Sequence, residues 1–165
     1  MSTRLKTSAI VFGVLLLLCG YFYFQVDWEV RAIRKQLKQV AELVEKEGSV
    51  STFESLARSR QLSNCFTEHA KVEYLAGRAC AGGPDELGRA FLAVWNQVDS
   101  ASVAILRHDV ELSEQHPEAK SRVTVNARVI LAGNDAMRDS VQYQIYWRKL
   151  DGDWLIHEVV TVGAP

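Results

Sequence analysis

Apolar residues in the segment after Asp27 recur at spacings of three and four. They stand at Val30, Ile33, Leu37, Val40 and Val44. This spacing predicts an α-helix with one narrow apolar seam, which the charged run from Glu45 to Gly48 ends. Two heptads are too short for a coiled coil alone, so we expect the seam to pack on a sheet of the same chain, with a dimerising stalk as the alternative.

Two more helices are predicted before residue 99, with a short strand over residues 71–76 between them. Ser51 and Glu54 match a capping box, which opens a helix with a predicted core face at Phe53, Leu56 and Ala57. Pro84 and the two acids after it suit another helix start, because proline needs no donor there and acids favour the positive end of the helix dipole. Its apolar positions at helical spacing are Leu87, Phe91, Val94, Trp95 and Val98.

After Asp99 the apolar period changes to two, the period of a strand with one buried face. Four strands are predicted, at about residues 102–112, 122–131, 140–150 and 154–162. Asp151-Gly152 predicts a tight hairpin between the last two. Helices followed by such an antiparallel meander predict an α+β fold, with helices packed on a curved antiparallel sheet. The predicted apolar face of the second and third strands is formed by Val123, Val125, Ala127, Val129 and Leu131, and by Val141, Tyr143, Ile145 and Trp147.

An uncharged apolar run covers residues 8–24, and Gln25 and Val26 lengthen it. A helix needs roughly 20 such residues to cross a bilayer. A cleaved signal peptide would need small residues at its cleavage site, whereas the residues that end this run are bulky. Lipidation at Cys19 is the other alternative. We therefore predict an uncleaved transmembrane signal anchor.

The basic residues Arg4 and Lys6 in a very short tail favour a cytoplasmic N-terminus. The domain is then expected on the outer side, in the periplasm of a bacterial inner membrane. The predicted division of the chain is a cytoplasmic tail (1–7), a transmembrane signal anchor (8–26), a stem with the first helix (27–49) and the remainder of the domain (50–165).

Composition and charge fit one folded domain with an accessory segment. Of 165 residues, 48% are hydrophobic and 24% charged, and the formal net charge is −1. Nucleic-acid binders usually carry a basic stripe with interleaved aromatic residues, and this sequence has none. We therefore expect no nucleic-acid partner.

Three stretches resemble the nuclear transport factor 2-like superfamily, also called SnoaL-like or cystatin-like cone proteins. They are residues 66–74 entering a strand, the helix over 86–98, and the closing hairpin over 143–157, with its basic pair, Asp151-Gly152 and Trp154. The resemblance covers roughly residues 30–162 and implies a cone-shaped fold. It implies no single chemistry, because the superfamily includes dehydratases, isomerases, epoxide hydrolases and non-catalytic modules.

Enzymes that this chain resembles place a carboxylate or histidine inside the cone, where burial tunes its pKa. The apolar faces of the second and third predicted strands carry neither Asp nor Glu, so no catalytic residue is assigned. His157, or Glu158 in the other register, and Tyr143 are weak catalytic candidates. Candidates for a ligand pocket are Tyr74, Phe91, Trp95, Tyr143 and Trp147.

No metal or cofactor is predicted, because the histidines and cysteines lack ligand spacing and no phosphate-binding loop occurs. Cys65 and Cys80 could form a disulfide if the domain lies outside the cytoplasm, and two buried thiols are the equal alternative.

The polar face of the second and third strands is rich in uncharged hydrogen-bonding side chains. This composition suits a partner surface or a sheet-to-sheet homodimer as readily as a hydrated face. We expect a membrane-anchored, non-catalytic binding or assembly module of the cell envelope, with an envelope protein as partner. The alternatives are a small-molecule lyase or isomerase of the SnoaL-like type and a hydrophobic ligand carrier. The partner-face candidates are Thr124, Asn126, Gln142, Gln144 and Tyr146.

Overall fold

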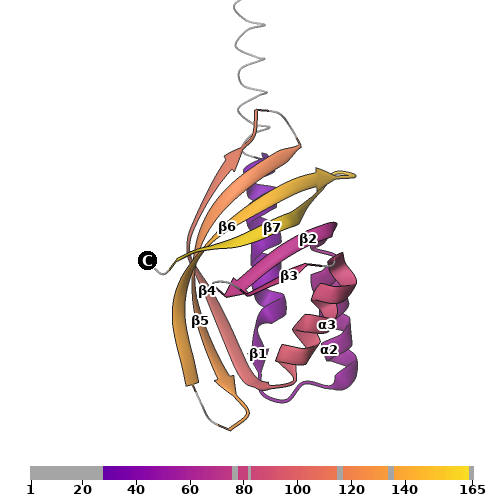
Figure 1. The fold of residues 1–165 in the computed structure, drawn as a ribbon, viewed down its shortest axis with the longest axis vertical. Coiled ribbons are helices and arrows are strands. Elements are labelled where there is room, and N and C mark those ends of the chain that lie inside the picture. Colours follow the sequence, from indigo (N-terminus) through magenta and orange to yellow (C-terminus); the bar gives the residue numbers. More distant parts are fainter. Residues whose placement is uncertain (1–27, 76–77, 82, 115–116, 134–135, 164–165) are drawn as a thin grey trace, which may run out of the picture.

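A curved sheet wraps around one long helix in the computed structural model, which describes residues 28–75, 78–81, 83–114, 117–133 and 136–163. The helix over residues 28–44 (the 28–44 helix) runs along the concave side of the sheet, and α2 (Thr52–Ser63) and α3 (Gly83–Trp95) lie together near its far end (Figure 1). The strands are β1 (Lys46–Glu47), β2 (Phe66–Leu75), β3 (Arg78–Ala81), β4 (Val98–Leu112), β5 (Glu118–Leu131), β6 (Ala136–Leu150) and β7 (Asp153–Gly163).

The strand order is β1-β4-β5-β6-β7-β2-β3, and every neighbouring pair is antiparallel except β2 with β7. This confirms the predicted α+β class and the meander of the last four strands. Asp151 (φ 51°) and Gly152 (φ 96°) form the turn between β6 and β7, as expected for a tight hairpin. The short strands β1 and β3 were not predicted, because two to four residues give no period to detect.

The seam of the 28–44 helix packs on the sheet of its own chain. Ile33 is fully buried and Leu37 nearly so, in one cluster with Val123, Ile145 and Ile156. Val123 and Ile145 come from the faces that the period-two pattern predicts to be apolar. A helix that buries its seam in this way has no free seam for a dimerising stalk.

The predicted membrane anchor, residues 8–26, lies outside the described residues, as do the tail before it and Cys19. Among the residues that the structure describes, no helix combines the length and apolarity needed to cross a bilayer.

The predicted core face of α2 is wrong. Phe53 is 83% exposed and Leu56 is 45% exposed, whereas the buried side of the helix consists of Ser55, Ser59, Leu62 and Ser63. Serine hydroxyls are buried here because α2 packs on the backbone of α3. Ser59 Oγ donates to Gly88 O at 3.0 Å and Ser63 Oγ to Pro84 O at 2.8 Å.

Gly88 makes this close packing possible, and Gly88→Ala should lower the free energy of unfolding by about 1–3 kcal/mol. A Cβ at this position would lie 2.7 Å from Ser63 Oγ and 3.0 Å from Ser59 Oγ. Urea denaturation measures the loss, and a second substitution, Ser63→Gly, should restore part of it. A stability equal to that of the parent chain would contradict this packing.

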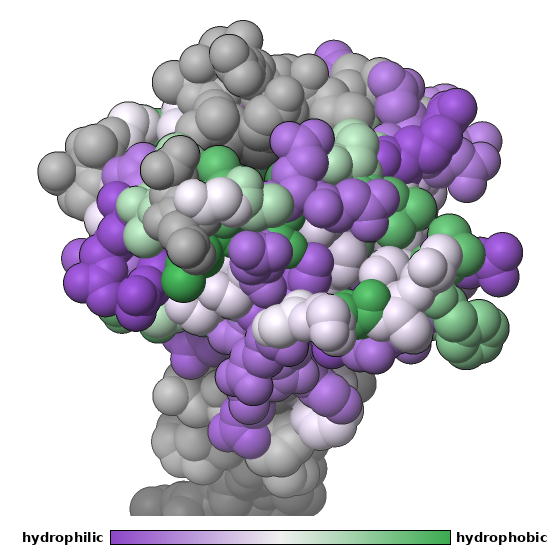
Figure 2. Space-filling view, turned by 90° about the horizontal axis from the view of Figure 1, so that it is seen from below, coloured by the Kyte–Doolittle hydropathy of each residue, from purple (hydrophilic) through white to green (hydrophobic). Residues whose placement is uncertain are grey.

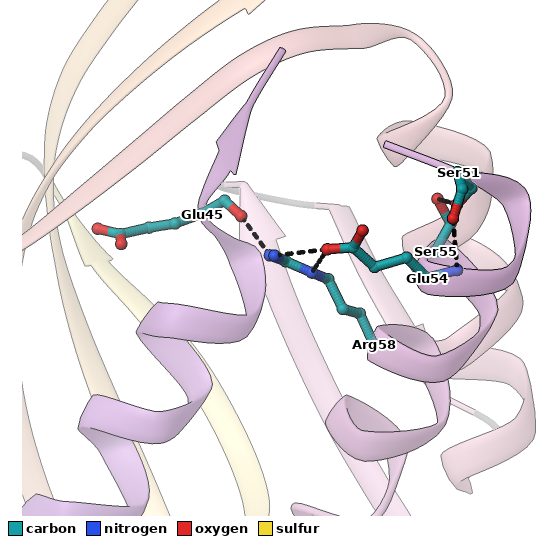
Figure 3. Close-up of polar contacts among 5 residues, drawn as sticks. All are labelled: Glu45, Ser51, Glu54, Ser55 and Arg58. Carbon is teal, nitrogen blue, oxygen red and sulfur yellow. Dashed lines mark hydrogen bonds and ion pairs between the residues drawn. The ribbon is translucent and has the colours of Figure 1, made fainter. Parts of the chain in front are cut away.

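Arg58 joins α2 to the end of the 28–44 helix (Figure 3). Its guanidinium donates to Glu45 O at 2.7 Å and, from two nitrogens, to Glu54 Oε1 at 3.0 and 3.2 Å. Ser51 caps the start of α2 as predicted, since Glu54 N donates to Ser51 Oγ at 3.2 Å. The Glu54 carboxylate, the other half of the predicted capping box, instead binds the arginine that links the two helices.

Of the two alternatives for Cys65 and Cys80, a disulfide or two thiols, the disulfide is not formed. Cys65 is a free, buried thiol, and burial raises its pKa. The register of β2 with β3 places Cys80 opposite Val72. Val72 is seven residues beyond Cys65, a separation of roughly 20 Å along an extended strand, so the two cysteines cannot be bridged.

Candidate ligand-binding hollow

A cavity of about 300 Å³ lies between the 28–44 helix and the concave face of the sheet. We call it the concave hollow. The helix forms one wall, and β2, β4, β5, β6 and β7 form the rest, mostly with valine, isoleucine and other apolar side chains. Seen from below, hydrophobic residues show between hydrophilic ones rather than as one continuous apolar surface (Figure 2). A cavity of this size and lining suits a small, largely apolar molecule.

Two side chains among the described lining residues can exchange a proton, Glu73 from β2 and Tyr143 from β6. Thr161 on β7 connects them, because it is the cross-strand partner of Tyr143 and its backbone N donates to Glu73 Oε2 at 3.1 Å. Thr161 Oγ1 also lies 3.4 Å from Glu73 O. The carboxylate of β2 and the phenol of β6 therefore lie on the two strands that flank β7, at the level of Thr161.

Burial raises the pKa of Tyr143, and the negative charge of Asp139 raises it further. The phenol therefore stays protonated at neutral pH and can donate a hydrogen bond or a proton. An oriented carboxylate and a protonated phenol that line the same hollow can remove one proton from a bound molecule and supply another.

Glu73 corrects the expectation that the cone lacks an acid. It follows Val72, which also lines the concave hollow, so strict alternation would put Glu73 on the opposite face. The register with β3 is regular through Val72 and Glu73 and shifts only after Glu73. The sequence pattern alone therefore did not predict this carboxylate at the hollow.

His108 lies next to the concave hollow, opposite the lining residue Val123. Its Nε2 is buried and has no hydrogen-bond partner among the described residues. The pKa of His108 is lowered to about 4, first by burial and then by the charge of Arg34, against the opposing charge of Asp109. At neutral pH the imidazole is therefore uncharged.

This lowered pKa predicts a loss of stability on acidification. Between the usual histidine pKa of 6.5 and about 4, the unfolded chain binds a proton that the folded chain does not. Stability should therefore be full above pH 6.5 and fall toward pH 4, by up to about 1.4 kcal/mol per pH unit. Urea denaturation at several pH values measures this slope, and His108→Leu should flatten it. An unchanged slope in that variant would assign the acid sensitivity to other groups.

Of the five side chains predicted for a pocket, Tyr143 lines the concave hollow. Trp147 is buried in the core and its Nε1 donates to Ser121 Oγ at 2.8 Å. Phe91 and Trp95 lie on α3 and stack on each other, with ring centroids 4.8 Å apart. The side chain of Tyr74 lies outside the described part of the structure.

The catalytic candidates of β7 do not line the concave hollow. The β6–β7 register passes from Trp147 with Ile156 to Tyr146 with Glu158, so His157 occupies a bulge. His157 Nδ1 lies 3.0 Å from Thr67 Oγ1. His157 and Glu158 instead line a separate surface pocket of about 310 Å³ together with Tyr146. The sequence suggested two regular registers for this strand, one with His157 and one with Glu158 facing inward. The bulge at His157 fits neither of them.

The partner-face candidates all lie on the convex side of the sheet. Thr124 pairs with Gln142 across β5 and β6, and Gln144 Nε2 donates to Tyr146 Oη. Lys120 lies over the Tyr146 ring, with its Nζ 5.8 Å from the centroid. The remaining member, Asn126, is on the same face, opposite Ser140.

In the described ranges, no three His, Cys, Asp or Glu side chains gather as a metal ion would require.

Comparison with known proteins gives similarity in fold and not in sequence. No protein-family model matches this chain, and no curated protein matches it. Among solved structures, a scytalone dehydratase-like protein from Novosphingobium aromaticivorans is similar with a TM-score of 0.65 and 18% identity, over 83% of this chain and 86% of that one.

Two further structures agree with it. The Kfla4162 protein from Kribbella flavida has a TM-score of 0.68 and 15% identity, over 82% of this chain and 90% of that one. A hexachlorocyclohexane dehydrochlorinase, LinA type 2, has a TM-score of 0.66 and 13% identity, over 83% and 87%. Together with the curved sheet and its helices, these similarities confirm the cone-shaped fold that the resemblance implied for the described part of this chain.

Proposed function

We propose that this chain is a lyase or isomerase that moves a proton on a small, largely apolar molecule held in the concave hollow. The observation that carries the proposal is that Glu73 and Tyr143 both line the hollow, on the strands that flank Thr161, in an otherwise apolar lining. Two proteins of similar fold have names that describe elimination, a dehydratase-like protein and a dehydrochlorinase.

Glu73 acts as the base in the proposed reaction and Tyr143 as the acid. The carboxylate takes a proton from a carbon atom next to an electron-withdrawing group, and the electron pair of that C–H bond forms a double bond. In an elimination, the leaving group departs with the pair of its own bond and the Tyr143 proton. In an isomerisation, the same phenol donates a hydrogen bond to the enolate oxygen while the proton returns at another carbon.

Exchange of carbon-bound hydrogen for deuterium tests the proton-transfer step without knowledge of the natural substrate. Phenylacetone is a neutral, apolar ketone with acidic C–H bonds, and NMR in D2O follows its deuteration. The parent chain should accelerate exchange, and Glu73→Gln should reduce this acceleration by about 100-fold or more. Tyr143→Phe should reduce it by about tenfold or more. Glu111→Gln, which removes an exposed carboxylate of β4, should leave it unchanged.

Each rival function has its own outcome in the same experiment. Binding of phenylacetone without exchange would favour a hydrophobic ligand carrier. Equal exchange in the parent chain and Glu73→Gln would reject Glu73 as the base.

The convex polar face supports a second candidate, the non-catalytic assembly module, which the anchor predicted for residues 8–26 would hold at a membrane. If Gln144→Ala with Tyr146→Ala abolishes co-purification of an envelope protein while the hollow variants do not, the assembly function stands instead.

A further inference from the structure

The ionisable side chain that lines the concave hollow is acidic. Glu73 is the only Asp, Glu, Lys, Arg or His among its described lining residues. Asp139 lies on the same side of the sheet, because its cross-strand partner is Ala127, which lines the hollow. Cross-strand partners project from the same face. Both carboxylates therefore belong to the concave side, at β2 and β6.

The basic residues of β5 and β6 lie on the convex face, except Lys149, whose side chain pairs with Glu29 of the 28–44 helix. Arg128 and Arg138 are cross-strand partners one position away from Ala127 and Asp139, so they project from the convex face. On the helix side, Lys38 pairs with Glu42 at 3.6 Å, and the exposed Arg34 lies near His108. His108 adds no positive charge at neutral pH, because its pKa is about 4.

We infer that the concave hollow accepts apolar molecules with an uncharged or cationic head group and rejects carboxylates. This inference rests on the proposed function and narrows its substrate class. An anion in the hollow would meet Glu73 in an apolar cavity, where like charges repel more strongly than in water. An alcohol, ketone or amine meets no such repulsion and can accept a hydrogen bond from Tyr143 or donate one to Glu73. Asp139 extends the same negative field toward Tyr143.

Three probes of matched shape test this charge selectivity, namely 3-phenylpropanol, 3-phenylpropylamine and 3-phenylpropanoate. Their dissociation constants for the full chain are measured by ligand-observed NMR in one buffer, with a protein-free blank. The alcohol and the amine should bind, and the carboxylate should bind at least tenfold more weakly than the alcohol. Glu73→Gln should reduce the ratio of the carboxylate's dissociation constant to that of the alcohol at least fivefold. Asp139→Asn should reduce this ratio by a smaller factor.

Val125→Trp fills the hollow and should abolish binding if the probes bind there. Glu111→Gln removes an exposed carboxylate outside the hollow and is the matched control for Glu73→Gln. The charge selectivity is overturned if the carboxylate binds as tightly as the alcohol, or if Glu73→Gln leaves the ratio of their dissociation constants unchanged. In either case the hollow remains a binding site. If no probe binds, or if Val125→Trp leaves binding unchanged, the concave hollow is not the ligand site, and the proposed function falls together with the selectivity.

Discussion

Trp147→Ala should lower the free energy of unfolding by about 3–5 kcal/mol, because it removes a large side chain from the packed core. Trp147 is 1% exposed and lies in the cluster that joins the 28–44 helix to β5, β6 and β7. Its truncation would leave a void beside Ile33 and Ile156, which the surrounding rigid sheet can fill only in part. Urea denaturation, with the slope of the transition unchanged, is the appropriate measurement.

Ser121→Ala separates packing from hydrogen bonding at this position. It keeps the indole in place but removes the acceptor of Trp147 Nε1, which lies 2.8 Å from Ser121 Oγ. A buried donor without a partner costs about 1–3 kcal/mol, so this variant should be the milder of the two. If Trp147→Ala costs less than Ser121→Ala, the core is not organised around the indole ring.

The sheet could be predicted from sequence because its strands alternate over long distances. Val123, Val125 and Ala127 point to the concave side as the period of two requires, and their strand β5 runs over residues 118–131. A regular pattern along β5 and β6, which pair without a register shift, leaves little freedom for the register. The helices of the N-terminal half were found for the same reason, since the seam from Ile33 to Val44 follows helical spacing.

The face of α2 could not be predicted, because the usual association of burial with apolar residues fails there. Ser59 and Ser63 are buried since their hydroxyls bond to the backbone of α3, whereas Phe53 remains exposed. A pattern of hydrophobicity carries no information on such close backbone contacts. The small size of Gly88 was visible in the sequence, but its partner helix was not.

The candidate site was only partly predictable, for two distinct physical reasons. Tyr143 was found because it lies within a regular strand. Glu73 was missed because it lines the hollow directly after Val72, against the strand period, and His157 was placed in the cone although a bulge in β7 removes it from there. His108 was treated only as a non-metal histidine, since its burial depends on the helix packed above β4. Chemistry in this fold thus depends on local departures from the strand period.

The first described turn of the 28–44 helix carries a buried acid, and Glu29→Ala should destabilise the chain by about 2–4 kcal/mol. Glu29 is 8% exposed, and its carboxylate accepts from Lys149 Nζ at 2.5 Å and from Trp154 Nε1 at 2.6 Å. Removal of one partner from a fully buried pair costs about 3–5 kcal/mol. We expect somewhat less here, because the Lys149 side chain is 31% exposed and can regain water.

Two companion variants show how the Glu29 contacts act, with urea denaturation as the measurement. Glu29→Gln keeps an acceptor for the Trp154 indole but loses the charge facing Lys149, so it should cost less than Glu29→Ala. Glu29→Leu combined with Lys149→Met removes both charges, and its remaining cost should reflect the unpaired Trp154 Nε1, about 1–3 kcal/mol. Because these contacts fix the helix that walls the concave hollow, Glu29→Ala should also weaken binding of 3-phenylpropanol. A variant that loses stability but binds the probe unchanged would show that the wall is held in place by Ile33 and Leu37 alone.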